Sequence, residues 1–160
     1  MTPFRATEPY DWSVLLYLVQ ICFAELKGRI NPPSSMYRMT LDSVSNHART
    51  GEIWVIEMVS PIACVFLEPR KNRLYLSKLS VHPKHRRRGH ASRLLRLAEQ
   101  RANQLGLEAL TLETRVELIE NHALFKRHGF YVTEKTSHPG FDRPTSLSMR
   151  KDLAPGPLPR

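Results

Sequence analysis

The sequence predicts a mixed α/β fold in which helices pack on a central sheet. Two observations favour it. β-rich runs, some of them joined only by short turns, are interleaved with segments whose apolar residues recur at helical spacing. The chain also has 160 residues, 41% of them hydrophobic, which suffices for the core of one ordinary domain, expected over residues 1–153. The expected order of elements is β-α-α-β-β-β-α-β-α-β-β.

The N-terminal part is expected to contain a short strand and a helix. Residues 2–7 suit the strand. The apolar residues of 12–26 follow helical spacing, with Thr7 as a candidate N-cap and Pro9 in the first turn. Gly28 and the prolines after it break this helix.

A second helix and a hairpin are expected next. Thr40 or Asp42 could cap a helix that ends at Gly51. Residues 52–59 and 61–69 are both rich in β-forming residues and are separated by a tight connection, which is typical of a hairpin.

The strand that follows, residues 74–81, changes its side-chain alternation part of the way along. Leu74 and Leu76 have one parity, whereas Leu79 and Val81 have the other. A β-bulge shifts the alternation by one residue, although a strand buried on both faces would look similar.

Two helices flank the next expected strand, residues 107–114. Helical spacing begins at Ala91 and continues to Gly106, which stands where a C′ glycine belongs. Asn121 is a candidate cap of a short helix that Gly129 ends.

Two strands are expected to complete the sheet, residues 131–136 and 145–152. Three prolines then occur within residues 154–160, so a flexible tail is expected there.

Positive charge is concentrated at one strand-to-helix turn. The net charge of +9 favours an anionic partner, such as a phosphorylated ligand or a nucleic acid. Arg86, Arg87 and Arg88 stand directly before Gly89 and the helix near Ala91. The first turn of a helix presents unpaired N–H groups, and a glycine lets phosphate approach them. The alternative is that Gly89 only makes the turn and the arginines are a solvated surface.

Other kinds of site are disfavoured. The sequence has neither a P-loop nor a dinucleotide fingerprint. Aromatic residues do not interleave with the arginines, so no nucleic-acid partner is expected. Cys22 and Cys64 lie in apolar runs without metal-ligand spacing, as buried cysteines of a cytoplasmic protein do. No metal, membrane span or signal peptide is expected.

Two motifs resemble those of the GNAT superfamily of N-acetyltransferases. Residues 124–130, "LFKRHGF", are similar to the family's L/F-Y-x-x-x-G-F segment. Residues 79–95, "LSVHPKHRRRGHASRLL", are similar to its acetyl-CoA motif V-x-P-x-x-R/Q-x-x-G-x-G/A. The matching positions in the second motif are Val81, Pro83, Arg86, Gly89 and Ala91.

The resemblance implies a GNAT fold, with a mixed sheet of six to seven strands that is split in a V and flanked by about four helices. It also implies acetyl-CoA (coenzyme A) as co-substrate, with no metal. The pantetheine arm would lie in the split, and N–H groups of the arginine loop would hold the pyrophosphate. The implied CoA-binding residues are Leu79, Ser80, Val81, Arg86, Arg87, Arg88, Gly89, His90, Ala91, Ser92, Asn121 and Phe125.

The family reaction is direct attack of an amine on the thioester, which needs a base for the amine and a proton for the thiolate. In many members the tyrosine of the L/F-Y-x-x-x-G-F segment gives that proton. Here this position is Phe125, and Tyr131 is a candidate substitute. Some members have a glutamate base at the position of Tyr75. Three glutamates near strand ends are rival bases, namely Glu68, Glu113 and Glu117.

The resemblance therefore implies transfer of an acetyl group from acetyl-CoA to a primary amine of a small molecule or peptide. The alternatives are a CoA-binding sensor and an acyltransferase that uses a different acyl-CoA. In this fold, two loops that here are residues 28–37 and 137–144 usually border the acceptor pocket. Dimers are common in the family, so a homodimer is one expected state, although no residue of this sequence requires it. The polar candidates for acceptor contacts are Arg29, Asn31, Tyr37, His138 and Asp142.

Overall fold

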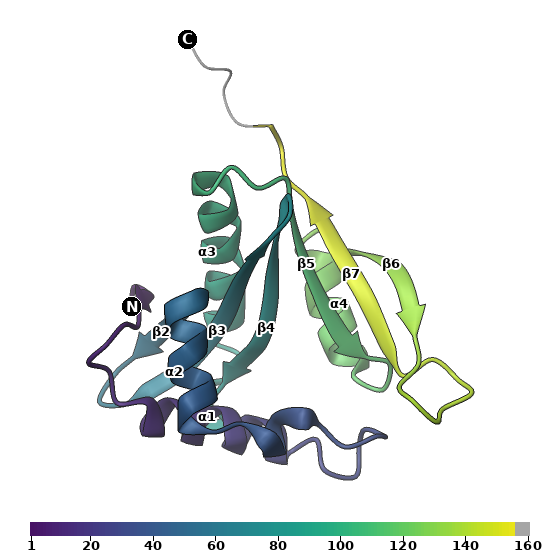
Figure 1. Cartoon of the computed structure of the whole chain (residues 1–160), viewed down its shortest axis with the longest axis horizontal. Helices are drawn as coiled ribbons and strands as arrows, with labels where there is room; N and C mark the ends of the chain where they lie inside the picture. The colour runs from purple at the N-terminus through teal and green to yellow at the C-terminus, as the bar shows by residue number, and fades with distance from the viewer. Residues whose placement is uncertain (156–160) are drawn as a thin grey trace.

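The computed structural model describes residues 1–155, and its centre is a seven-stranded sheet (Figure 1). The strand order is β1-β2-β3-β4-β5-β7-β6. The β4–β5 pair is parallel, and every other neighbouring pair is antiparallel. The strands are β1 Phe4–Arg5, β2 Glu52–Glu57, β3 Pro61–Arg70, β4 Arg73–Val81, β5 Ala109–Arg115, β6 Tyr131–Thr136 and β7 Ser146–Asp152.

Helices cover both faces of this sheet, so the expected mixed α/β fold is confirmed. Residues 156–160, which form most of the expected tail, lie outside the described residues. The α-helices are α1 Trp12–Ala24, α2 Leu41–Thr50, α3 His90–Gln104 and α4 Ile119–Arg127, and the 3₁₀ helices are η1 Ser35–Arg38 and η2 Pro83–His85.

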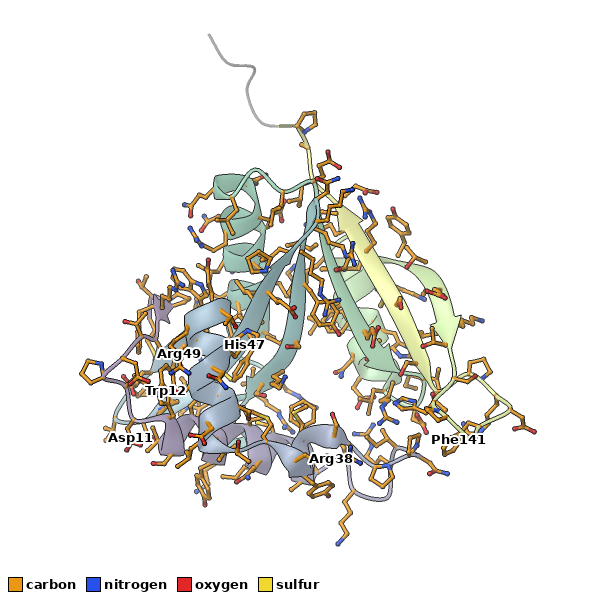
Figure 2. All side chains as sticks on the ribbon, viewed as in Figure 1. Asp11, Trp12, Arg38, His47, Arg49 and Phe141 are labelled. Atoms are coloured by element: carbon orange, nitrogen blue, oxygen red, sulfur yellow. The ribbon has the colours of Figure 1, made fainter. Side chains whose placement is uncertain are left out.

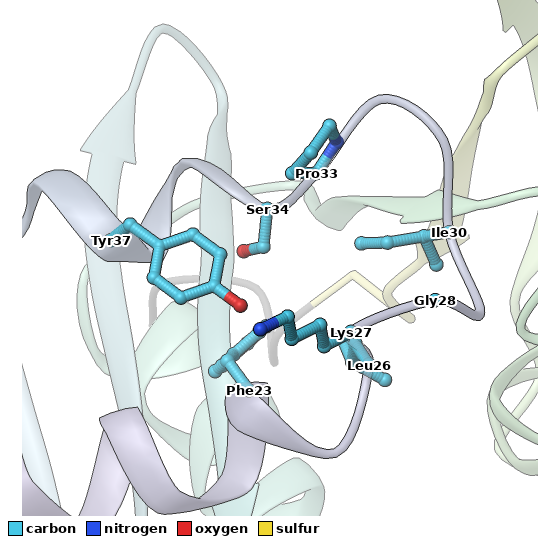
Figure 3. Close-up of a pocket in the computed structure, with 8 residues that line it drawn as sticks. All are labelled: Phe23, Leu26, Lys27, Gly28, Ile30, Pro33, Ser34 and Tyr37. Atoms are coloured by element: carbon cyan, nitrogen blue, oxygen red, sulfur yellow. The ribbon is translucent and has the colours of Figure 1, made fainter.

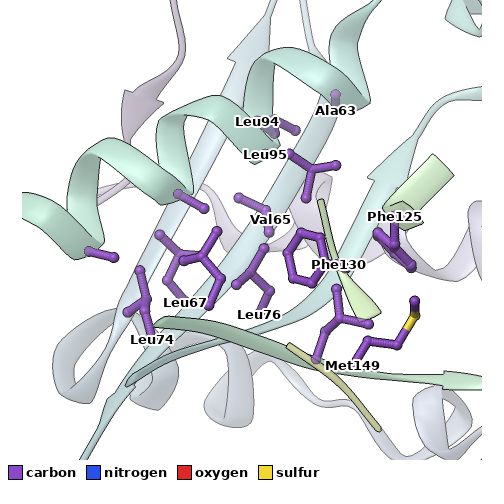
Figure 4. Packing of buried hydrophobic residues seen from close by; sticks show 14 of the residues in the cluster. Ala63, Val65, Leu67, Leu74, Leu76, Leu94, Leu95, Phe125, Phe130 and Met149 are labelled. Carbon is purple, nitrogen blue, oxygen red and sulfur yellow. The ribbon is translucent and has the colours of Figure 1, made fainter. Parts of the chain in front are cut away.

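Two hydrophobic clusters hold these layers together, one on each face of the sheet. Both include residues of β3, which is therefore buried on both faces. Val65 and Leu67 pack with α3 and α4 in one cluster, which Figure 4 shows together with Phe125. Cys64 and Phe66 point to the other face and pack with α1 and α2. Alternate residues of one strand therefore serve two cores, each buried large side chain contributing roughly 1.5–3 kcal/mol of transfer free energy.

The expected start of α1 is wrong. Its N-cap is Asp11, whose Oδ1 accepts a hydrogen bond from the backbone N–H of Ser13 at 3.0 Å. Thr7 cannot take this role because the chain just before it is held against the sheet, where Ala6 N–H donates to Ile53 O at 2.9 Å. The chain must leave β2 before the helix can begin, so strand pairing overrides the local cap signal.

The two other cap predictions have opposite outcomes. Thr40 caps α2 in a reciprocal capping box with Ser43, as one of the two alternatives predicted. Asn121 is not the cap of α4, because α4 begins after Leu118, whose carbonyl accepts from Asn121 N–H at 3.0 Å and from His122 N–H at 3.2 Å. The Asn121 side chain is therefore not used to cap α4.

The bulge indicated by the change of parity is present in β4. Between the pairs Cys64–Ser80 and Phe66–Ser77, β4 has two residues where β3 has one. Lys78, one of these two, has φ of +53° in the left-handed region. A bulge bends its strand, and this one begins two residues after Leu76, the last residue of β4 that pairs with β5.

β4 and β5 pair only at one end, and this divides the sheet. Four residue pairs join them, from Arg73–Ala109 to Leu76–Leu112. Beyond these pairs the two strands diverge like the arms of a V (Figure 1). The edge of β4 that faces β5 therefore has no strand partner from Ser77 onward within residues 1–155.

Candidate active site

The split between β4 and β5 opens into a cleft of about 750 Å³. Its walls come from five parts of the chain, which are the two diverging strands, the segment from the end of α1 through η1, α4, and the β6–β7 loop. The lining residues on the sheet, α4 and the N-cap of α4 are Tyr75, Leu76, Ser77, Lys78, Leu79, Leu112, Glu113, Thr114, Arg115, Leu118, Asn121, Phe125 and Ser146.

Four of the residues expected to bind CoA or take part in the chemistry line this cleft from two elements, and the rival base Glu113 and the acceptor candidates Tyr37 and His138 line it as well. Tyr75 and Leu79 come from β4, whereas Asn121 and Phe125 come from α4. Phe125 is nearly buried, and its ring lies 5.8 Å from that of Phe130. The structure thus brings together residues that are up to 50 positions apart, from Tyr75 to Phe125.

Ser80 and Val81 lie at the same stretch of β4 but contribute mainly to its shape. The Ser80 side chain is buried, and its hydroxyl donates to the carbonyl oxygen of Lys78 at 3.0 Å, across the bulge. The carbonyl oxygen of Val81 accepts from Cys22 Sγ at 3.3 Å and from Arg86 Nε at 3.4 Å. These bonds fix the backbone of the strand where it passes the cleft.

A row of backbone N–H groups follows the end of β4. Within residues 1–155, the N–H groups of residues 86–92 donate to no other protein atom. Gly89 is the N-cap of α3 with φ of +81°, and a Cβ placed on it would meet nothing within 4 Å. These donors and the helix dipole fit an anionic group, and a diphosphate has the charge and oxygen count to use several of them.

The arginines beside this row differ in their contacts. Arg86 forms an ion pair of 2.6 Å with Glu25 at the end of α1. Arg88 Nη1 lies 3.4 Å from His85 Nδ1, and Arg87 has φ of +62°. Arg86 therefore fixes the loop to α1, and Arg87 contributes to the sharp turn.

The first turn of α3 is held by two further contacts. The buried His90 ring lies 3.0 Å from Arg93 Nη1, and burial followed by the Arg93 charge lowers the pKa of His90. Ser92 Oγ lies 2.9 Å from His128 Nε2, at the end of α4. Ala91, between them, adds only a methyl group. The N-terminus of α3 is therefore fixed relative to α4 as well as β4.

Tyr75 and Glu113 face the cleft from opposite sides of the split. The guanidinium of Arg70 lies 3.7 Å from the centre of the Tyr75 ring. Burial, and then the charge of Glu113, raises the pKa of the Tyr75 hydroxyl above its ordinary value. Glu113 has the only carboxylate among the described cleft-lining residues. Glu113 is therefore the better placed of the two to accept a proton.

Tyr131 and Glu117 do not line the cleft. The Tyr131 hydroxyl donates to Asp152 at 2.5 Å on the exposed edge of the sheet, and this bond raises its pKa. Glu117 Oε2 accepts the backbone N–H of Asn31 at 3.0 Å, while Glu117 Oε1 is buried without a hydrogen-bond partner in the described chain. Neither side chain is brought together with Tyr75 and Phe125.

Sequence reasoning missed two cationic residues of the cleft. Lys78 is placed in the cleft by the bulge, with Nζ 5.2 Å from the centre of the Phe66 ring. Burial lowers the pKa of Lys78. Arg115 donates to the carbonyl oxygens of Pro32 at 2.7 Å and Pro33 at 3.1 Å. The parity change indicated the bulge that contains Lys78. No pattern in the sequence indicates the contact of Arg115 with Pro32 and Pro33.

A smaller cavity of about 50 Å³ adjoins the cleft, and the two share six lining residues (Figure 3). Its walls are mainly apolar, with Lys27, Ser34 and Tyr37 supplying polar atoms. The complete lining is Phe23, Leu26, Lys27, Gly28, Ile30, Pro33, Ser34 and Tyr37.

In residues 1–155, His, Cys, Asp and Glu form no group of three or more arranged to hold a metal ion. No helix there has the length and apolar character needed to cross a bilayer.

A sheet split between two parallel strands, with a helix N-terminus beside the first, defines the class of acyl-CoA N-acyltransferases. The acetyltransferase (GNAT) family matches residues 17–130, and the chain belongs to this family. The expected membership is thereby confirmed. A search of curated proteins found no match.

Solved structures share this fold at low sequence identity. PaiA N-acetyltransferase from Thermoplasma acidophilum in complex with coenzyme A has a TM-score of 0.79 at 15% identity, over 96% of this chain and 100% of that one. A GNAT acetyltransferase from Elizabethkingia anophelis with acetyl-CoA bound has a TM-score of 0.66 at 17% identity, over 95% and 97%. The NatC complex bound to Gag peptide and CoA gives 0.62 at 20% identity, over 96% and 100%.

Proposed function

We propose that this protein transfers an acetyl group from acetyl-CoA to a primary amine. The observation that carries the proposal is that the free edge of β4 is followed, beyond the end of that strand, by a row of free backbone N–H groups. An extended chain with a diphosphate at one end has the shape and charge to use both. Similar solved structures that hold CoA or acetyl-CoA support the choice of donor.

In this proposal, binding depends mainly on the backbone. The exposed edge of β4 around Leu79 and Val81 would bond the amide groups of pantetheine as an added strand would. The N–H groups of residues 86–92 would hold the pyrophosphate, with Arg87 and Arg88 adding charge. Acetyl-CoA supplies the activated acyl group as a thioester. Asn121 and Phe125 line the cleft opposite β4 and limit where the thioester end can lie.

The acceptor amine must be neutral to attack, so a group in the cleft must take its proton. We assign this role to Glu113, directly or through one water, because it has the only carboxylate among the described lining residues. Tyr75 is disfavoured as the base, since its raised pKa keeps the phenol protonated near neutral pH. Its hydroxyl can still orient the acceptor by hydrogen bonding.

The departing thiolate has no tyrosine at the position of Phe125, and Tyr131 lies outside the cleft. Thiols have a pKa of about 8.5, so a thiolate released into the cleft can be protonated by water at neutral pH. A dedicated acid would speed this step without being required for it.

The test is a thiol-release assay with acetyl-CoA and a panel of primary amines, together with calorimetry of acetyl-CoA binding. Amine-dependent release with product masses increased by one acetyl group supports the proposal. Binding without release for any amine would favour the sensor. Release only with a longer acyl-CoA would favour the other acyltransferase.

A further inference from the structure

The acceptor end of the cleft is closed by a segment that crosses the split. Residues 29–33, here called the strap, leave the α1 side of the molecule and contact β5 and the start of α4 (Figure 1). Arg29 pairs with Glu120 at 2.5 Å, and Asn31 N–H donates to Glu117 at 3.0 Å. The strap therefore joins the two arms of the V at their wide end.

Arg115 makes the third connection, through the carbonyl oxygens of Pro32 and Pro33. The three connections come from different residues of the strap and reach different residues beyond the split. Prolines also restrict the backbone of the segment itself. A strap fixed in this way crosses the wide end of the split, where an extended polypeptide would have to pass between the arms, so it favours a small acceptor.

The charge of the same region is unbalanced. Cationic side chains line the cleft or the cavity of Figure 3 at Lys27, Arg38, Lys78 and Arg115, against the one carboxylate of Glu113. Within residues 1–155, Lys27, Arg38 and Lys78 form no ion pair. Arg38 lies on η1 at the wide end of the split (Figure 2).

The lack of an ion pair matters most at Lys78, because this side chain is partly buried. Its ammonium group lies over the Phe66 ring, within the layer of α1 and α2, where it is partly removed from water. The charge of Glu68 acts on Lys78 but Glu68 forms its ion pair with Arg70, so the partly desolvated ammonium group still favours an anionic ligand in direct contact. A substrate carboxylate would supply the missing partner, while its amine is directed to Glu113 on the opposite strand.

We propose that the acceptor is a small amine that also carries a carboxylate, as free amino acids do, and that Lys78 and Arg38 bind this carboxylate. The apolar walls beside Lys27, from Phe23, Leu26 and Ile30, suit an aliphatic or aromatic side chain on the same molecule. This inference rests on the proposed acetyl transfer and specifies its substrate class.

The test measures kcat/KM by thiol release for matched probes, namely leucine, leucinamide and isopentylamine, the corresponding phenylalanine set, and a ten-residue peptide with N-terminal leucine. We expect the free amino acids to exceed their amides and amines by about 10-fold or more, and the peptide by a larger factor. Equal or better rates with the amides, the amines or the peptide would overturn this inference while leaving acetyl transfer in place. Lack of release with every probe, despite acetyl-CoA binding, would instead contradict the proposed function.

Variants distinguish recognition of the carboxylate from general damage. Lys78→Gln and Arg38→Gln are expected to raise KM for leucine by about 10-fold and to change KM for leucinamide less than about twofold. Lys71→Gln is the matched control, because Lys71 is exposed in the β3–β4 turn, away from the cleft. If Lys78→Gln and Arg38→Gln both leave the preference for leucine over leucinamide unchanged, the assignment of the carboxylate site is wrong.

Discussion

The guanidinium of Arg115, on β5, donates to the carbonyl oxygen of Pro32 at 2.7 Å, across a separation of 83 residues in sequence. A second donor reaches Pro33 at 3.1 Å. Because β5 and the strap belong to opposite sides of the split, this contact decides how open the acceptor end of the cleft is.

Replacing Arg115 should loosen the strap. In Arg115→Gln we expect faster backbone hydrogen exchange at residues 29–33 and a loss of roughly 1–2 kcal/mol in the free energy of unfolding, since two charge-assisted hydrogen bonds are removed. Exchange measured by mass spectrometry checks this. Arg150→Gln, which removes an exposed ion pair with Asp152 on neighbouring β7, is the control and should leave the strap unchanged. Unaltered exchange in Arg115→Gln would show that Asn31 and Arg29 alone hold the strap.

The choice of base predicts different effects for two cleft residues. Glu113→Gln should lower kcat by about 100-fold or more, whereas Tyr75→Phe should lower it by less than about 10-fold. Glu68→Gln tests the rival base on the neighbouring strand and should lower kcat less than Glu113→Gln, because Glu68 is exposed, pairs with Arg70 and does not line the cleft. A larger loss in Tyr75→Phe than in Glu113→Gln, in steady-state assays with saturating acetyl-CoA, would reverse the assignment.

Restoring the family tyrosine should be tolerated. Phe125→Tyr places a hydroxyl on a ring that lines the cleft, so the variant should fold and have an equal or higher kcat. Thermal unfolding and steady-state kinetics measure both effects. A large fall in kcat with unchanged stability would mean that the bare ring of Phe125 shapes the cleft, and a large fall in stability would mean that the hydroxyl points toward Phe130.

Acid should weaken one anchor of α3. Burial of the Glu52 carboxyl opposes its ionisation, but the hydrogen bonds from Arg101 and Trp54 outweigh this and lower its pKa below 4.5. The folded-state pKa is thus below the unfolded value, so the stabilisation is present above pH 4.5 and is lost as the pH falls through the folded pKa. Glu52→Gln should cost about 1–3 kcal/mol at pH 7, and the difference should shrink below pH 4.5. A difference that stays constant in denaturant titrations at pH 7 and pH 3.5 would contradict this cause.

Local signals in the sequence predicted the elements well, and they failed where distant parts of the chain compete. The cap signal at Thr40, one of two predicted alternatives, and the parity change around Leu79 depend on neighbouring residues, and the structure confirms both. Thr7 failed because Ala6 bonds to Ile53 on β2, a contact that local cap preferences do not reveal.

In the candidate site, too, local features were predictable from the sequence and contacts between distant residues were not. The motif from Val81 to Ala91 predicted the row of free N–H groups. These groups belong to consecutive residues of one loop and the first turn of α3, so the local sequence is sufficient to indicate them. Glu117 and Tyr131 were expected near the chemistry but are held elsewhere by Asn31 and Asp152. Both partners lie far from them in sequence, and no residue pattern encodes these contacts.

The central claim is that backbone N–H groups at the start of α3 bind the anionic part of acetyl-CoA. The most direct measurement is calorimetric titration of acetyl-CoA into the wild type, Gly89→Glu and Gly106→Glu. Both glycines have positive φ, +81° and +71°, and both have open space around the Cβ position, so the two variants carry a similar backbone strain. We predict that Gly106→Glu keeps the wild-type affinity and that Gly89→Glu loses about 100-fold or more, since its carboxylate would stand against the diphosphate. Equal affinity in all three proteins would contradict the account.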